Sequence, residues 1–180
     1  MNRQPVLENE RLLIRPLEES DWDALFAVAS DPAIWEQHPM HDRWREDVFR
    51  AFFDDAMAKG GALAIIDKTK DEVIGSSRYQ AHDPEDGGSV EIGWTFFATK
   101  CWGKGINRQA KRLMLAHAFE FVERVDFRVG ETNYRSQIAL ENIGAERTRR
   151  TELARYQGAR LLHRVFEITR EGFENGPLSK

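Results

Sequence analysis

The chain contains a single cysteine, Cys101, among its 180 residues. One thiol cannot form an internal disulfide or a cysteine zinc site, so disulfide-stapled scaffolds and cysteine-rich zinc modules are excluded, and a reducing, cytoplasmic location fits. The sequence also lacks any apolar run close to the ~20 residues of a membrane span. Its first residues, MNRQPVLENERLLIRP, lack the apolar centre of a signal peptide. We therefore expect no membrane partner and no export.

The sequence has no excess of basic residues either. Lysine and arginine number 26 against 30 aspartates and glutamates, which gives a net charge of −4. That balance gives no general attraction to nucleic acid, so we expect no nucleic-acid partner. The length of 180 residues and the hydrophobic content of 41% are typical of one globular unit, and we predict a single domain over residues 1–180.

The spacing of apolar residues predicts strands and helices in mixed order. Alternating or β-branched runs indicate strands, and apolar residues three and four apart indicate helices. The predicted strands cover 11–15, 62–67, 72–79, 89–97, 125–130, 146–155 and 160–168. One predicted helix begins after Ser20-Asp21, and the others cover 44–57, 109–122 and 134–143.

A local cationic segment stands out within this acidic chain. None of the 28 residues between Glu91 and Glu120 is a carboxylate, although the average density predicts about five. The same segment carries five basic residues, Lys100, Lys104, Arg108, Lys111 and Arg112, and two glycines, Gly103 and Gly105, just before the predicted long helix. Glycine lets the backbone approach a ligand closely, and the first-turn amides and dipole of a helix favour an anion. This segment therefore predicts a phosphate site.

The order of elements and three motifs resemble the GNAT superfamily of acetyl-CoA-dependent N-acetyltransferases. The motifs are RLLIRPLEESDWDAL near the start, the glycine loop Trp-Gly-Lys-Gly at 102–105, and NYRSQIALENIGA at 133–145. Within the family they are most similar to the branch that acetylates ribosomal-protein amino termini. The resemblance implies an α+β fold with a twisted, mixed and mostly antiparallel sheet of about seven strands, flanked by about four helices. A homodimer is compatible with it.

The resemblance implies acetyl-CoA as co-substrate, and we expect no metal. The glycine loop would bind the diphosphate, and strands 89–97 and 125–130 would splay apart to bind the pantetheine arm. The implied contacts are Phe96, Phe97, Ala98, Trp102, Gly103, Lys104, Gly105, Ile106, Asn107, Arg108 and Asn133. This chain departs from the branch at 107–109, where Asn, Arg and Gln replace a small residue, a hydroxyl residue and Glu.

The implied reaction is direct attack of a primary amine on the thioester. Deprotonating an α-amine at pH 7 costs only about 1 kcal/mol, against about 4.6 for a lysine side chain, so an α-amine needs less help from a base. We predict Glu91 as the base, although a solvated strand carboxylate is the alternative. Ser136 is predicted to protonate the leaving thiolate, with a helix start capped by Asn133 as the alternative. Leu140 replaces the tyrosine that many family members use there.

The acceptor is the least defined part of the prediction. Trp35 and Trp44, together with Glu91 and the acidic loop 83–86, are candidates for binding a peptide or small-molecule amine, whereas core packing and solvation are the alternatives. Cys101 as an acetyl carrier, a metal site at His38 and His41, and an RNA contact at Arg147, Arg149 and Arg150 are weaker hypotheses. A catalytically inactive CoA sensor is the alternative function.

Overall fold

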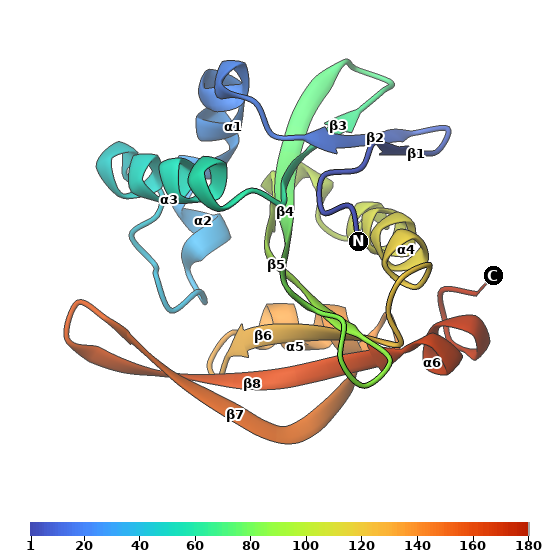
Figure 1. The fold of residues 1–180 in the computed structure, drawn as a ribbon. Coiled ribbons are helices and arrows are strands. Elements are labelled where there is room, and N and C mark those ends of the chain that lie inside the picture. The colour runs from blue at the N-terminus through green and yellow to red at the C-terminus, as the bar shows by residue number, and fades with distance from the viewer. Residues whose placement is uncertain (180) are drawn as a thin grey trace.

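An eight-stranded sheet forms the centre of the computed structural model, which describes residues 1–179. The spatial order is β1-β2-β3-β4-β5-β6-β8-β7, and every neighbouring pair is antiparallel except β5 and β6 (Figure 1). The strands are β1 (Leu7–Glu8), β2 (Leu12–Pro16), β3 (Ala62–Asp67), β4 (Glu72–Asp83), β5 (Ser89–Phe97), β6 (Arg124–Gly130), β7 (Glu146–Tyr156) and β8 (Ala159–Thr169).

Helices cover both faces of this sheet. They are α1 (Trp22–Ala29), α2 (Pro32–Trp35), α3 (Glu46–Lys59), α4 (Ile106–Ala118), α5 (Tyr134–Glu141) and α6 (Arg170–Asn175). In Figure 1, α1–α3 lie on one side of β4 and β5 and α4 lies on the other. None of the helices in residues 1–179 is long and apolar enough to cross a bilayer.

Two apolar clusters hold these layers together. Phe49, Phe53 and Phe96 belong to the cluster beneath α1–α3, which also includes the fully buried Leu25. Met114 and other residues of α4 belong to the larger cluster on the opposite face, with residues of β5, β6 and β8. Burial of these side chains at roughly 25 cal/mol per Å² of apolar surface is the main force that fixes the sheet between its helices.

The mixed, mostly antiparallel α+β fold is confirmed, with one more strand and two more helices than predicted. The extra pieces, β1, α2 and α6, are two to six residues long, too short to produce a periodic pattern. The long helix spans 106–118 instead of 109–122. It starts at once after Gly105, which adopts a left-handed φ of +72°, and it ends where the chain turns at Phe119.

The parallel pair β5 and β6 separates along its length. The two strands pair only at Ser89 with Arg124, Val90 with Val125 and Glu91 with Asp126. β5 then continues to Phe97 and β6 to Gly130 without pairing to each other. On its other edge β5 carries an extra residue opposite β4, where Trp94 adopts a φ of +53°. Such a bulge bends the strand and increases its twist, so the predicted splay is present.

Candidate active site

Glu91 lies at the point where β5 and β6 part, because its partner Asp126 is the last residue of the parallel ladder. Strand alternation places Glu91 on the opposite face from Val90 and Ile92, which belong to the cluster on the α4 side. Glu91 is only 7% exposed. The alternative of a solvated strand carboxylate is therefore wrong.

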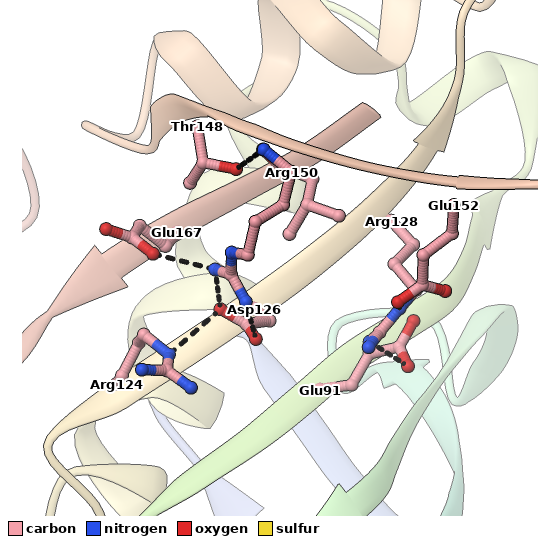
Figure 2. Close-up of polar contacts among 9 residues, drawn as sticks. Glu91, Arg124, Asp126, Arg128, Thr148, Arg150, Glu152 and Glu167 are labelled. Atoms are coloured by element: carbon pink, nitrogen blue, oxygen red, sulfur yellow. Dashed lines mark hydrogen bonds and ion pairs between the residues drawn. The ribbon is translucent and has the colours of Figure 1, made fainter. Parts of the chain in front are cut away.

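The Glu91 carboxylate is held by an arginine of the neighbouring strand. Arg128 Nη1 donates to Glu91 Oε2 at 2.6 Å, and Arg128 Nε lies 2.8 Å from Glu152 Oε1 (Figure 2). Burial raises the pKa of Glu91 above its ordinary value, and the charge of Arg128 opposes that rise without cancelling it. A carboxyl with a raised pKa at the opening of the sheet has the character of a general base.

A second ion-pair group is centred on Asp126, which lies on β6 like Arg128. Arg150 donates to both oxygens of Asp126 at 2.8 and 2.9 Å and also to Glu167 at 2.7 Å, while Arg124 lies 3.3 Å from Asp126 (Figure 2). The bidentate pair ties β7 to β6 just where the parallel ladder ends. The Arg150 side chain is itself 44% exposed, so it reaches the buried Asp126 from a solvated face of β7.

The glycine loop meets the geometric needs of a phosphate site. Gly103 and Gly105 have φ values of +70° and +72°, and a Cβ at either position would meet no atom within 4 Å, so the surrounding space is open. The first bond of α4 runs from the Gln109 amide to the Gly105 carbonyl at 3.1 Å. The amides of Ile106, Asn107 and Arg108 precede that bond and are the orphan donors of the helix start.

The predicted backbone contacts for the pantetheine arm are partly engaged. The Trp102 indole N–H donates to the Phe97 carbonyl at 3.2 Å, and the Ala98 amide donates to the Ile74 carbonyl at 2.8 Å. Phe96 points to the other side of the sheet, where its ring lies 5.1 Å from that of Trp35. Trp102 thus links the glycine loop to the free end of β5.

The cationic patch expected from the sequence is smaller in the structure. Lys111 turns inward and is 4% exposed, with its amine 2.6 Å from Thr95 Oγ1. Lys100 bonds to Glu72, and Arg108 donates to the Pro177 carbonyl. The expectation that Lys111 belongs to a surface anion site is wrong, because its position on α4 shares the buried face with Ala110, Met114 and Leu115.

The start of α5 confirms the predicted cap. Asn133 Oδ1 accepts from the Ser136 amide at 3.2 Å, which satisfies one of the first-turn donors. Ser136 is partly buried, and in residues 1–179 no side-chain hydrogen bond holds its hydroxyl. Leu140 is buried, whereas Tyr134 is 63% exposed.

The aromatic candidates divide between core and surface. Trp35 is 3% exposed, and its N–H donates to the Ala29 carbonyl at 2.7 Å, while Trp44 is 42% exposed. Core packing thus describes Trp35 well. Burial raises the pKa of the Cys101 thiol, which disfavours the nucleophilic thiolate. Within residues 1–179, His, Cys, Asp and Glu side chains do not cluster as a metal site would require.

Sequence reasoning missed two buried arginines on the α1–α3 side of the sheet. Arg78 is 1% exposed and lies over the Trp94 ring at 4.7 Å, and Arg43 is 6% exposed and lies over the Phe52 ring at 4.5 Å. Arginine is so commonly a surface residue that its position in the sequence gave no signal.

Comparison with known proteins places this chain in a family. Residues 11–146 match the model of the acetyltransferase (GNAT) domain. An uncharacterized N-acetyltransferase p20 from Bacillus licheniformis is 28% identical over 149 residues, 79% of this chain and 83% of that protein.

Two solved structures that hold CoA share the fold. RimJ from Mycobacterium smegmatis, solved with CoA-disulfide, has a TM-score of 0.72 at 19% identity and covers 98% of this chain and 91% of its own. Spermidine N-acetyltransferase from Vibrio cholerae, solved with CoA and spermine, has a TM-score of 0.68 at 16% identity. The match covers 93% of this chain and 100% of that protein. At these identities the likeness is one of fold.

Proposed function

The chain belongs to the GNAT family of N-acetyltransferases, and on that premise we propose that it transfers the acetyl group of acetyl-CoA to a primary amine by direct attack. The observation that carries the proposal is the position of Glu91, a buried carboxyl at the last paired residue of two strands that then separate. From this opening β5 runs on to Phe97, and the glycine loop suited to phosphate follows at 102–105. We propose one such domain over residues 1–180.

The glycine loop is the proposed site for the diphosphate of acetyl-CoA. The amides of Ile106, Asn107 and Arg108 would donate to phosphate oxygens, and the thirteen-residue helix α4 would add its dipole. The open space at Gly103 and Gly105 lets the ligand approach the backbone, and Lys104 is exposed beside it. The pantetheine arm would follow β5 past Phe97 and Ala98 and reach Asn133.

In the proposed chemistry Glu91 takes the proton of the attacking amine, directly or through a water. The amine nitrogen forms a bond to the thioester carbon, the carbon–sulfur bond breaks, and the thiolate leaves with a proton that Ser136 donates. Ser136 then regains a proton from water, and Glu91 releases its proton to water. The raised pKa of Glu91 suits the first transfer, because a base is most effective when its pKa lies near the working pH. No metal is needed for this sequence of steps.

For the acceptor we propose an α-amine, free or at the end of a peptide, because its lower pKa needs less from the base. The sequence motifs resemble the branch that acetylates ribosomal-protein amino termini, and the ribosomal-protein-S5-alanine acetyltransferase of Vibrio fischeri shares the fold. The acetylation of spermidine by another protein of this fold makes a polyamine the second candidate.

The experiment is thiol release from acetyl-CoA with a peptide bearing a free amino terminus and with spermidine. We expect turnover with the peptide, and we expect Gly105→Glu to abolish it, because the new side chain fills the loop and places a negative charge where phosphate binds. Gly158→Glu is the matched control, since Gly158 also has a positive φ of +80° and open surroundings but lies in the β7–β8 turn. Full activity of Gly105→Glu would refute the phosphate assignment.

A further inference from the structure

Two buried arginines gather around one aromatic ring on the α1–α3 side of the sheet. The guanidinium carbons of Arg43 and Arg78 lie 4.5 and 5.7 Å from the centre of the Phe52 ring. Arg43 comes from the connection between α2 and α3, and Arg78 comes from the middle of β4. Burial, with a smaller contribution from the charge of Arg78, lowers the pKa of Arg43 to about 10. Two like charges are thus held close together away from water.

The donors of Arg78 are only partly satisfied. Nη1 donates to Asp55 Oδ2 at 3.0 Å and to Gln80 Oε1 at 3.3 Å, while Nε and Nη2 are buried without a partner. Asp55 is shared, because its other oxygen lies 2.8 Å from Lys59 Nζ. A single shared carboxylate therefore faces this buried guanidinium.

Arg43 has fewer partners still. Nη2 donates to the Met40 sulfur at 2.8 Å, Nη1 faces His38 Nε2 at 3.4 Å, and Nε is buried without a partner. Burial lowers the pKa of His38 to about 3, so its ring is neutral, and Nδ1 accepts from the Met40 amide at 2.9 Å. The ring hydrogen must then be on Nε2, which makes it a donor facing a donor. Within residues 1–179, Arg43 bonds to no oxygen.

The nearby carboxylate of Asp42 does not fill this need. Its two oxygens accept from the Tyr156 hydroxyl and from the Gln157 amide, both at 2.9 Å. Buried donors of a charged group are costly when they lack acceptors, and native structures nearly always supply them. The three unpartnered nitrogens, two on Arg78 and one on Arg43, point to an acceptor that arrives with a ligand.

Arg78 lies on the same face of the sheet as the proposed base. In the β4–β5 ladder Arg78 pairs with Gly93 and Gln80 pairs with Glu91, so Arg78 and Glu91 share a face two residues apart along the strands, which is about 7 Å. The Met40 side chain, which occupies Nη2 of Arg43, is only half-buried. A ligand oxygen that replaced this flexible thioether would gain Nη2 of Arg43 as a donor.

We propose that Arg43 and Arg78 form an acceptor subsite for a carboxylate, so that the amine substrate carries a carboxylate a few bonds from its reacting nitrogen. The planar guanidinium matches a carboxylate through paired hydrogen bonds. Free amino acids and peptides with an acidic residue at or next to the amino terminus both offer this chemistry. Polyamines do not, because two buried cations repel them. The proposal rests on the proposed acetyl transfer and narrows its acceptor.

The test compares two isosteric acceptors, aspartyl-alaninamide and asparaginyl-alaninamide, with free aspartate and spermidine alongside. We expect a kcat/KM at least tenfold higher for the aspartyl compound, since a hydrogen-bonded charge contributes roughly that much or more. The kcat/KM for free aspartate, compared with that for the aspartyl dipeptide, then shows whether the substrate is an amino acid or a peptide. Arg43→Gln and Arg78→Gln should bring the ratio of kcat/KM for the aspartyl and asparaginyl compounds close to one. Arg43→Lys keeps the charge but not the planar guanidinium, so it should keep part of the aspartyl preference.

Arg50→Gln is the control, because Arg50 also lies over an aromatic ring of this layer, that of Trp22 at 4.6 Å, but is exposed. It should keep the aspartyl preference. The affinity for CoA, measured by calorimetry, should stay constant in all variants, and Arg43→Gln provides the test if Arg78→Gln does not fold. Equal use of the two dipeptides, better use of spermidine, or an unchanged ratio in a folded Arg43→Gln protein overturns the subsite. Failure to bind CoA or to acetylate any amine instead overturns the proposed function itself.

Discussion

Replacing the buried Lys111 by methionine should stabilise the protein, and by more at low pH than at high pH. The Lys111 amine lies 2.6 Å from Thr95 Oγ1 and 3.4 Å from Ser77 Oγ, and it is 5.8 Å from the Phe127 ring. Neither partner is charged. Burial alone lowers the pKa of Lys111 from 10.5 to about 7. The chain thus holds an amine whose charged form is disfavoured by its surroundings.

The magnitude follows from the two pKa values. Because the folded pKa lies about 3.5 units below the unfolded one, the lysine destabilises the folded state by about 5 kcal/mol below pH 7. Between pH 7 and 10.5 the unfolded chain binds the extra proton, so this cost shrinks as the pH rises, to about 2 kcal/mol at pH 9. Methionine loses the two hydrogen bonds, worth about 1 kcal/mol each, although Ser77 and Thr95 still bond to each other at 2.8 Å.

The assay is urea unfolding of wild type and Lys111→Met at pH 6 and pH 9. We expect a net stabilisation of about 3 kcal/mol at pH 6 and little change at pH 9. The exposed Lys70 serves as the control, and Lys70→Met should alter neither value by more than about 0.5 kcal/mol. A Lys111→Met protein that is less stable than wild type by the same amount at both pH values would refute this reasoning.

Three further changes test the site and the sheet. If Glu91 is the base, Glu91→Gln should lower kcat roughly tenfold to a hundredfold at pH 6.5 and less at pH 9, where more of the amine is already neutral. The control is Glu152→Gln, which removes the exposed partner of Arg128 and should change kcat only slightly. An unchanged pH–rate profile in Glu91→Gln would exclude Glu91 as the base. Gly75→Ala should lower the free energy of unfolding by more than about 2 kcal/mol, because its Cβ would lie 2.2 Å from a carbonyl oxygen of β5. Gly158→Ala, which has open space around it, should lower it by only about 1 to 2 kcal/mol. Thermal or urea unfolding measures both values. Cys101→Ala should keep kcat within about twofold, because a buried thiol with a raised pKa is a poor nucleophile; loss of turnover in a folded variant would contradict direct attack.

Local chemistry made most elements of this fold predictable. The run from Ser89 to Phe97 is a strand in the sequence pattern and in the structure, and Asn133 caps the helix that its spacing to Ser136 predicts. The glycine loop could be located because Gly103 and Gly105 require a backbone that other residues rarely adopt. Signals of this kind arise within a few residues of the chain.

The remaining features depend on contacts between distant segments. Arg43 and Arg78 meet around Phe52 only because α3 packs on β4. The Lys111 side chain lies in the interior because its position on α4 faces the core. A reading of the hydrophobic pattern assigns a charged residue to the surface, so it places Lys111 there. The pairing of Glu91 with Arg128 likewise depends on the register of two strands that are far apart in sequence.

The most direct test of the account is isothermal titration calorimetry of the wild-type chain with CoA and with pantetheine, which lacks the diphosphate together with the phosphorylated adenosine, so that the Gly105→Glu variant isolates the contribution of the diphosphate. If the amides at the start of α4 hold the diphosphate, CoA should bind at least a hundredfold more tightly than pantetheine, and that difference should disappear in Gly105→Glu while Gly158→Glu retains it. Equal affinity for the two ligands in the wild-type chain, or a preference for CoA that survives Gly105→Glu, would contradict the assignment.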